Sequence, residues 1–134
     1  MIVVDTSAWV ELLRSTRSTV HQALRRLILE RADLAVTEIV VMEILAGARD
    51  AHEERELQGR LFAYRLLPLR GIAGYEEAAE LYRACRSAGE TLRTMTDCLV
   101  AVPTIEAGAT LLHADADFEV LARHSTLRLE PLET

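Results

Sequence analysis

The chain begins MIVVDTSAWVELLR (residues 1–14), and this stretch sets the pattern for the rest of the sequence. Its apolar start predicts a buried strand over residues 2–5, and the residues that follow predict a helix over 7–14. The strand therefore ends on a carboxylate, Asp5, rather than on another apolar residue. An acid at this position can cap the following helix, and it can also be the first residue of a functional site. One aspartate does not distinguish these two possibilities.

Strands and helices alternate along the remaining chain in the same way. Short apolar runs predict strands, and apolar residues three or four positions apart predict helices. Strands are expected over residues 34–36, 65–69, 110–114 and 126–130, and helices over 19–31, 38–47, 50–64, 74–88, 97–107 and 116–123. This alternation predicts an α/β fold with three layers, α/β/α, and a mostly parallel central sheet. Because the sequence contains no linker, repeat or low-complexity stretch, we expect residues 1–134 to form a single domain.

The charged residues narrow the range of possible functions. The formal net charge is −6, which argues against a protein that holds nucleic acid by bulk positive charge. All 15 basic residues are arginine, and the sequence contains no lysine. A P-loop, a Schiff base and a lysine-dependent phosphoryl-transfer site are therefore excluded. Arginine is nevertheless well suited to bidentate contacts with phosphate.

Hydropathy and cysteine content are those expected of a cytoplasmic protein. No apolar stretch approaches the length of a membrane span, and the N-terminus has no basic residues ahead of a cleavable apolar segment. We therefore expect a cytoplasmic location without membrane association. Cys85 and Cys98 lack the spacing of metal ligands, so we expect two buried thiols rather than a disulfide.

Acids from separate parts of the chain lie in apolar surroundings. Asp5 follows the first strand, and Asp115 follows a later strand, with Asp117 two residues beyond it. Asp97 begins a helix, and Glu43 lies in the middle of one, where an exposed position is the alternative to a functional role. In a parallel sheet, ligands bind in the crevice outside the carboxyl ends of the strands. Buried carboxylates are costly unless they are paired, and a hard cation such as Mg²⁺ or Mn²⁺ prefers oxygen ligands.

The acids at helix starts also have a purely structural interpretation. Asp5, Asp97 and Asp115 can each accept hydrogen bonds from the free amides of the helix that follows. At the first helix, Thr6 and Ser7 can take over that capping role if Asp5 is a ligand.

Four blocks of sequence, in order, carry a resemblance to a known family. They are MIVVDTSAWVELLR at 1–14, TEIVVMEILAG at 37–47, TDCLVA at 96–101 and LLHADADFEVLARH at 111–124, and the stretch YRACRSAGETLRTMTDC at 82–98 adds to them. With these blocks the chain resembles the PIN-domain ribonucleases, and within them the VapC toxins of bacterial toxin–antitoxin pairs. The resemblance covers the chain nearly end to end, and it implies that the expected α/β/α fold is a PIN-like domain.

The resemblance implies a Mg²⁺-dependent endoribonuclease, with Mn²⁺ as a possible substitute. Asp5, Glu43, Asp97 and Asp115 match the family's acidic quartet, and Asp117 matches an additional metal-binding acid. Asp5 and Asp97 are expected to bind the metal directly, while Glu43 or Asp115 orients the attacking water. One or two ions would activate that water and neutralise charge growing on the phosphodiester.

The resemblance also implies partners. The substrate is expected to be structured RNA, transfer or ribosomal. Arg14, Arg86 and Arg93 are candidates for contacts with its phosphates, each with the alternative of a solvated surface arginine. A VapB-like antitoxin whose C-terminal segment crosses the acidic crevice is implied as well, and so is a homodimer.

Two other functions are alternatives to a ribonuclease. A catalytically inactive PIN-fold binding module would carry the same acids as vestigial or structural residues. A receiver-type or aspartate-nucleophile phosphotransfer domain normally needs a lysine in its site, and this chain has none.

One departure from the family is Pro103, which falls in a helix that the family usually keeps alanine-rich. We expect that helix to kink there or its packing surface to differ.

Overall fold

The computed structural model describes residues 1–132, and in this part of the chain strands and helices alternate as the sequence predicts. The strands are β1 (Ile2–Val4), β2 (Leu34–Thr37), β3 (Arg65–Leu67), β4 (Thr110–Leu112) and β5 (Arg128–Leu129). The helices are α1 (Thr6–Leu13), α2 (Thr19–Leu29), α3 (Glu38–Ala46), α4 (Ala51–Leu61), α5 (Ile72–Ser87), α6 (Thr96–Glu106) and α7 (Asp117–Arg123). The expected helices agree with the observed ones to within a few residues at each end.

The strands within residues 1–132 form one parallel sheet in the order β3-β2-β1-β4-β5. In the central strand β1, Val3 is aligned with Ala35 of β2 and with Leu111 of β4. The chain first builds the sheet outward from β1 to β3. It then returns through α5 and α6 and places β4 on the other side of β1. The direction in which strands are added therefore reverses between β1 and β4.

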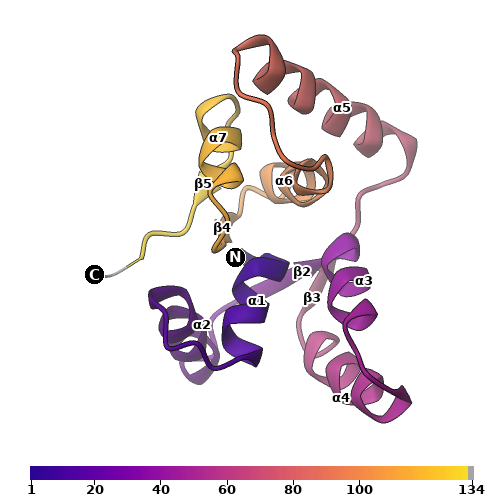
Figure 1. The fold of residues 1–134 in the computed structure, drawn as a ribbon, viewed down its shortest axis with the longest axis vertical. Helices are drawn as coiled ribbons and strands as arrows, with labels where there is room; N and C mark the ends of the chain where they lie inside the picture. The colour runs from indigo at the N-terminus through magenta and orange to yellow at the C-terminus, as the bar shows by residue number, and fades with distance from the viewer. Residues whose placement is uncertain (133–134) are drawn as a thin grey trace.

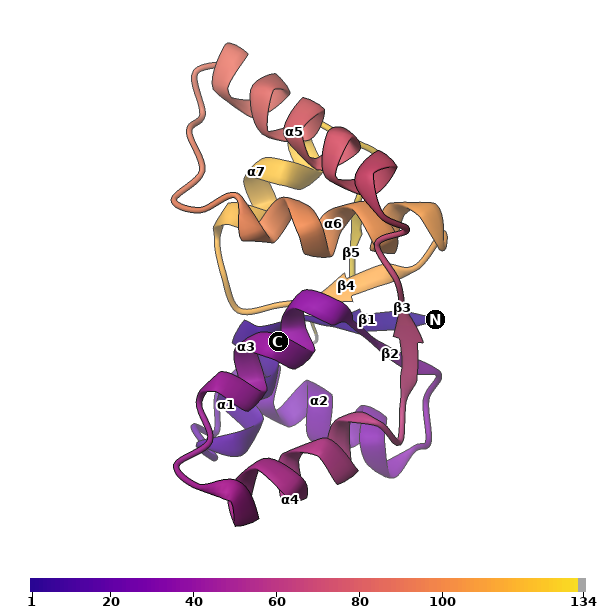
Figure 2. The ribbon, with the colours of Figure 1, turned by 90° about the vertical axis from the view of Figure 1, so that its right-hand side faces the viewer.

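The helices form two layers, one on each side of the sheet. Helices α5, α6 and α7 lie together on one side, and α1, α2 and α4 lie on the other (Figures 1 and 2). Helix α3 contacts α1, α4 and α6. This arrangement confirms the expected three-layer α/β/α fold with a parallel central sheet.

The central strands are buried because helices cover both faces of the sheet. Val3 and Val4 of β1 and Leu111 of β4 are fully buried, and so are Trp9 of α1 and Phe118 of α7. Close packing on both faces holds β1 and β4 in one register. The residues that follow these two strands are therefore fixed relative to each other.

The edge strands are shorter than the sequence suggests. β3 ends at Leu67, directly before Pro68, and β5 comprises only Arg128 and Leu129. Proline lacks the N–H that a further ladder bond would need, which explains the end of β3.

Helix α6 continues through Pro103 to Glu106. The proline is buried and, with Tyr75 and Leu99, lines a pocket of about 170 Å³. The N–H of Ala107 donates to the Pro103 carbonyl at 3.1 Å, so the turn after the proline closes with a regular hydrogen bond. Helix α6 is therefore continuous through Pro103.

The state of the two cysteines and the polarity of the helices were also predicted from the sequence. Cys85 and Cys98 are free and buried, as predicted, and burial raises the pKa of the Cys98 thiol to about 12. Within residues 1–132, none of the helices has the length and apolar character that crossing a bilayer requires.

Candidate active site

The ends of β1 and β4 bring two of the predicted acids together. Asp5 follows β1 and Asp115 follows β4, and these strands are neighbours where the order of the sheet reverses. The backbone N–H of Asp5 donates to the carbonyl of Leu112 at 3.0 Å, which extends the ladder one residue beyond β1. In parallel sheets, such a switch point opens a crevice at the carboxyl ends of the strands. This crevice is the candidate active site.

Asp5 is the N-cap of α1, and the hydroxyl residues after it do not replace it in that role. Its Oδ2 accepts hydrogen bonds from the backbone N–H of Ser7 at 2.9 Å and from the Ser7 hydroxyl at 2.6 Å. The expectation that Thr6 or Ser7 would take over the cap is therefore wrong. The Ser7 hydroxyl in turn accepts from the N–H of Ala114 at 2.9 Å. Ser7 thus fastens one oxygen of Asp5 to the loop that carries Asp115.

Glu43 reaches the site from α3. It is half-buried rather than exposed, and its Oε1 accepts a hydrogen bond from the Thr6 hydroxyl at 2.8 Å. Thr6 begins α1, directly after Asp5. The hydroxyl of Thr6 therefore orients Glu43 toward the end of β1, where the mid-helix position alone left its direction open.

Asp97 lies in the first turn of α6 and is 8% exposed. The N-cap position belongs to Met95, so Asp97 is not the cap of this helix. Its Oδ2 is buried and has no hydrogen-bond partner among residues 1–132. An unpaired buried carboxylate oxygen is costly, and it indicates that a ligand completes the site.

The electrostatics place all five acids in one cluster. Burial and the nearby carboxylates raise the pKa of Asp97 to about 7. Burial also raises the pKa of Asp5, although hydrogen bonds from Ser7 oppose the shift. The like charges that act on Asp97 are those of Asp5, Asp115, Asp117 and Glu43, in decreasing order. We call Asp5, Glu43, Asp97, Asp115 and Asp117 the carboxylate cluster.

The carboxylate cluster has the chemistry of a divalent-cation site. Carboxylate oxygens of Asp97, Asp115 and Asp117 lie within 4.8 Å of one another. The donors are all hard oxygens, which suit Mg²⁺ and Mn²⁺. A cation between them would satisfy the unpaired oxygen of Asp97 and neutralise the repulsion that raises its pKa. The residues present therefore fit a bound metal.

Arg93 is the one predicted arginine that touches the carboxylate cluster within residues 1–132. Its guanidinium is paired with Oδ1 of Asp115, and its Nε lies 3.3 Å from Oδ2 of Asp117. The backbone N–H of Arg93 also donates to Oδ2 of Asp117, at 3.0 Å. These bonds raise the pKa of Arg93, which was already high.

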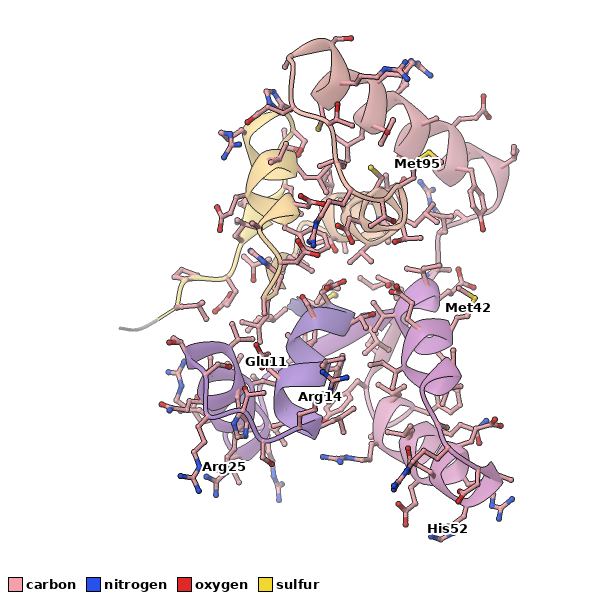
Figure 3. All side chains as sticks on the ribbon, in the orientation of Figure 1. Glu11, Arg14, Arg25, Met42, His52 and Met95 are labelled. Carbon is pink, nitrogen blue, oxygen red and sulfur yellow. The ribbon has the colours of Figure 1, made fainter. Side chains whose placement is uncertain are left out.

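The other two predicted arginines lie in different surroundings. Arg14 lines a groove of about 440 Å³ between α1, α3 and α4, which Thr6 and Glu43 also line. Figure 3 shows the Arg14 side chain extending from the end of α1 toward α3 and α4. Arg86 lies over the ring of Tyr82 on its own helix, 5.9 Å from the ring centre. The structure therefore brings Arg14 next to the site and gives Arg86 a contact elsewhere.

Three polar residues position the acids, and the sequence did not single them out for this. Thr6 and Ser7 bind Glu43 and Asp5, respectively. His113 accepts a hydrogen bond at Nδ1 from the backbone N–H of Asp115, at 3.1 Å. The adjacency of Thr6 and Ser7 to Asp5 was the available signal, but it indicated caps rather than partners of distant acids.

Comparisons with known proteins show which family the chain resembles. The chain matches the family model of the PIN domain over residues 2–124. It is 43% identical over 129 residues to VapC ribonuclease Mb1587 of Mycobacterium bovis, with 96% of each chain covered. The identity and coverage are the same for Ribonuclease VapC11 of Mycobacterium tuberculosis.

A solved structure shows the same fold. The crystal structure of VapBC2 from Rickettsia felis, bound to a DNA fragment from its promoter, contains a chain that superposes with a TM-score of 0.74. The superposition covers 99% of this chain and 100% of that one, at 19% sequence identity. At this identity the match concerns the fold.

Proposed function

Since this chain belongs to the PIN-domain family, and within it to the VapC ribonucleases, we propose that the carboxylate cluster is the catalytic centre of a toxin ribonuclease. The observation that carries the proposal is the buried, unpartnered Oδ2 of Asp97 among four other carboxylates. We also propose that residues 1–134 form a single PIN-like domain.

We propose Mg²⁺ as the metal, with Mn²⁺ as a substitute. When bound, such an ion activates a water molecule and neutralises charge on the phosphodiester. Asp97 contributes the oxygen that lacks a partner, and Asp5 contributes Oδ1, because Ser7 already engages its Oδ2. Glu43 also belongs to the metal-binding set, and Glu43 or Asp115 orients the attacking water. Asp115 and Asp117 add further metal-binding carboxylates, since their oxygens and one of Asp97 lie within 4.8 Å of one another.

The proposed substrate is structured RNA, transfer or ribosomal. The groove that Arg14 lines is continuous with the site, because Thr6 and Glu43 belong to both. An RNA strand leaving the cluster along this groove would meet the guanidinium of Arg14, a good partner for a phosphate. Arg93 is a second phosphate contact at the cluster, whereas Arg86 is the weakest of the three candidates because of its contact with Tyr82.

The proposed partners are a VapB-like antitoxin and a second copy of this chain, in the cytoplasm. VapBC2, whose toxin chain has the same fold, pairs a toxin with an antitoxin. Four large apolar side chains on or near α3 and α5 are more than half exposed, which supports a protein partner. They are Met42 (58%), Ile72 (75%), Tyr75 (54%) and Met95 (64%).

A cleavage assay tests the proposed activity. The chain, purified without its antitoxin, is incubated with total RNA in the presence of Mg²⁺ or of EDTA. We expect discrete products with Mg²⁺, and none with EDTA or with the Asp97→Asn variant. Mapping the ends of the products identifies transfer or ribosomal RNA as the target.

The control is Glu76→Gln, which removes one negative charge from the exposed face of α5 and is expected to cleave normally. Circular dichroism of each variant shows that it is folded. Intact RNA under every condition, from a folded protein, would favour the catalytically inactive binding module instead.

A further inference from the structure

Arg93 has an unusual position for a residue that is expected to bind RNA. It belongs to the segment between α5 and α6, and its guanidinium is paired with Asp115 and Asp117. These are two of the three acids whose oxygens converge within 4.8 Å. The positive charge of Arg93 therefore occupies the same carboxylates that a cation would use.

A guanidinium and a divalent cation compete at such a place for two reasons. They share acceptor oxygens, since Oδ1 of Asp115 is already bound by Arg93 and by the backbone N–H of Asp117. They also repel each other, because both are positive and the separation across the cluster is only a few ångströms. Full occupancy by the cation therefore favours departure of the guanidinium.

The side chain of Arg93 is free to leave, whereas its backbone is not. The side chain is 70% exposed, while those of Asp115 and Asp117 are 21% and 13% exposed. The backbone N–H of Arg93 is held independently by Oδ2 of Asp117, at 3.0 Å. If this bond persists, a guanidinium that swings away from the carboxylates stays tethered at the rim of the site.

We propose that Arg93 is an internal counter-ion of the carboxylate cluster, which a divalent cation displaces and which then binds an RNA phosphate beside the site. This inference rests on the proposed metal-dependent function. It makes Arg93 a positioning residue that couples metal binding to substrate binding. Arginine suits both states, because its planar fork matches carboxylate and phosphate alike.

The first test measures Mn²⁺ binding by isothermal titration calorimetry, without RNA. Arg93→Gln removes the competing charge, so we expect Mn²⁺ to bind about three- to tenfold more tightly than to the unmutated chain, as partly screened ion pairs predict. Arg93→Lys keeps the charge but loses the fork, and we expect an intermediate affinity. The control is Arg83→Gln, which removes one exposed arginine from α5 and is expected to leave the affinity unchanged.

Whether Arg93→Gln strengthens or weakens Mn²⁺ binding distinguishes a competing Arg93 from a supporting one. If Arg93 instead braces the carboxylates for the metal, Arg93→Gln weakens Mn²⁺ binding, and the inference is overturned while the metal site stands. An affinity that does not change has the same consequence. If the unmutated chain and all variants fail to bind Mn²⁺, the proposed metal site itself is overturned, and this inference with it.

The second test measures RNA binding by fluorescence anisotropy, with Ca²⁺ in place of Mg²⁺ and the RNA checked on a gel afterwards. With Ca²⁺, we expect Arg93→Gln to weaken binding of a short single-stranded RNA about three- to fivefold and to lower the salt slope by about one. With EDTA, the same substitution is expected to have little effect, because Arg93 is then engaged by the carboxylates. An equal loss in both conditions would overturn the exchange of partners.

Discussion

Single residues in the site show what burial does to a carboxylate. Asp97 is 8% exposed, its Oδ2 has no partner, and its pKa is raised to about 7. Asp5 is 4% exposed, but Ser7 donates two hydrogen bonds to it. Two acids of similar burial thus differ in how far the chain itself compensates for their charge. Within residues 1–132, the carboxylate of Asp97 is the less compensated of the two.

This difference predicts how stability depends on pH. Folding raises the pKa of Asp97 from 3.8 to about 7, so between these values the folded chain holds a proton that the unfolded chain has lost. Without divalent cations, the free energy of unfolding therefore falls as pH rises from 3.8 to about 7, by about 2–4 kcal/mol from this group. Urea denaturation in EDTA at several pH values measures it.

The Asp97→Asn variant removes this dependence. We expect it to be more stable than the unmutated chain at pH 8 in EDTA, and to gain much less thermal stability from added Mg²⁺. Glu76→Gln, which removes an exposed charge, is expected to keep the slope of the unmutated chain. A slope in Asp97→Asn equal to that of the unmutated chain would assign the pH dependence to other groups.

Ser7 offers a second prediction at this scale. Its hydroxyl donates to Asp5 and accepts from Ala114, so Ser7→Ala removes two hydrogen bonds, although Oδ2 of Asp5 keeps the one from the backbone N–H of residue 7. We expect a loss of about 1–3 kcal/mol in the free energy of unfolding, measured with urea. Ser87→Ala, at the exposed end of α5, is the matched control and is expected to change stability by less than about 0.5 kcal/mol.

The sequence predicted the acids but not their partners. Asp5, Glu43, Asp97 and Asp115 stood out because their neighbours in sequence are apolar. The bonds from Thr6 to Glu43 and from Ser7 to Ala114 depend on how elements far apart in sequence are aligned. The pairing of Arg93 with two acids depends on the path of the segment before α6. Local patterns contain none of this information.

At the scale of helices and strands, the start of α5 packs closely against the segment after β3. Gly74 faces the segment after β3, and a Cβ built on it would lie 2.1 Å from the carbonyl oxygen of Leu69. Backbone atoms cannot move aside as a flexible side chain can. The N–H of Leu69 is also fixed, because it donates to Oε1 of Glu38 at 2.9 Å.

Two glycine substitutions should therefore change the free energy of unfolding in opposite directions. Gly74→Ala forces α5 away from Leu69, and we expect it to lower the free energy of unfolding by about 1–3 kcal/mol. Gly59→Ala, in α4, meets nothing within 4 Å and is expected to raise it by up to about 1 kcal/mol through helix propensity. Urea denaturation of both variants measures the two changes, and a stabilised Gly74→Ala would contradict the contact.

The helices and strands were largely predictable, because the patterns that specify them lie within short stretches of sequence. Helical spacing and turn residues located every helix, and the apolar runs located every strand. The strands are shorter than predicted, both at the edge, where β5 has two residues, and inside the sheet, where β1 ends at Val4 and β4 at Leu112. The continuity of α6 through Pro103 was also open, because the surrounding packing decides whether a helix tolerates a proline.

At the scale of the whole molecule, α3 and α5 expose large apolar side chains, which are unfavourable in water unless a partner covers them. Met42 and Tyr75 line the pocket at Pro103, and both are more than half exposed. Figure 3 shows Met42 and Met95 on the same side of the molecule. If this surface joins two copies of the chain, a charge placed in it will separate them.

The substitution Tyr75→Glu tests the proposed homodimer. We expect the molar mass from light scattering after size-exclusion chromatography to fall to about half that of the unmutated chain, because an unpaired charge is costly at a packed interface. Phe62→Glu changes a residue of similar exposure, 58% against 54%, at the end of α4, and is expected to leave the mass unchanged. A monomeric unmutated chain would rule out the homodimer.

The placement of β1 beside β4 also has a consequence for synthesis. The hydrogen bond from Ala114 to Ser7 joins residues that are 107 positions apart. After Asp5 and Ser7 leave the site of synthesis, about a hundred more residues must be added before Asp115 can join them. At about 5–20 residues per second, that delay is about 5–20 s. A nascent chain thus lacks Asp115 and Asp117 during this interval. The carboxylate cluster therefore cannot form until the residues up to Asp117 have been synthesised.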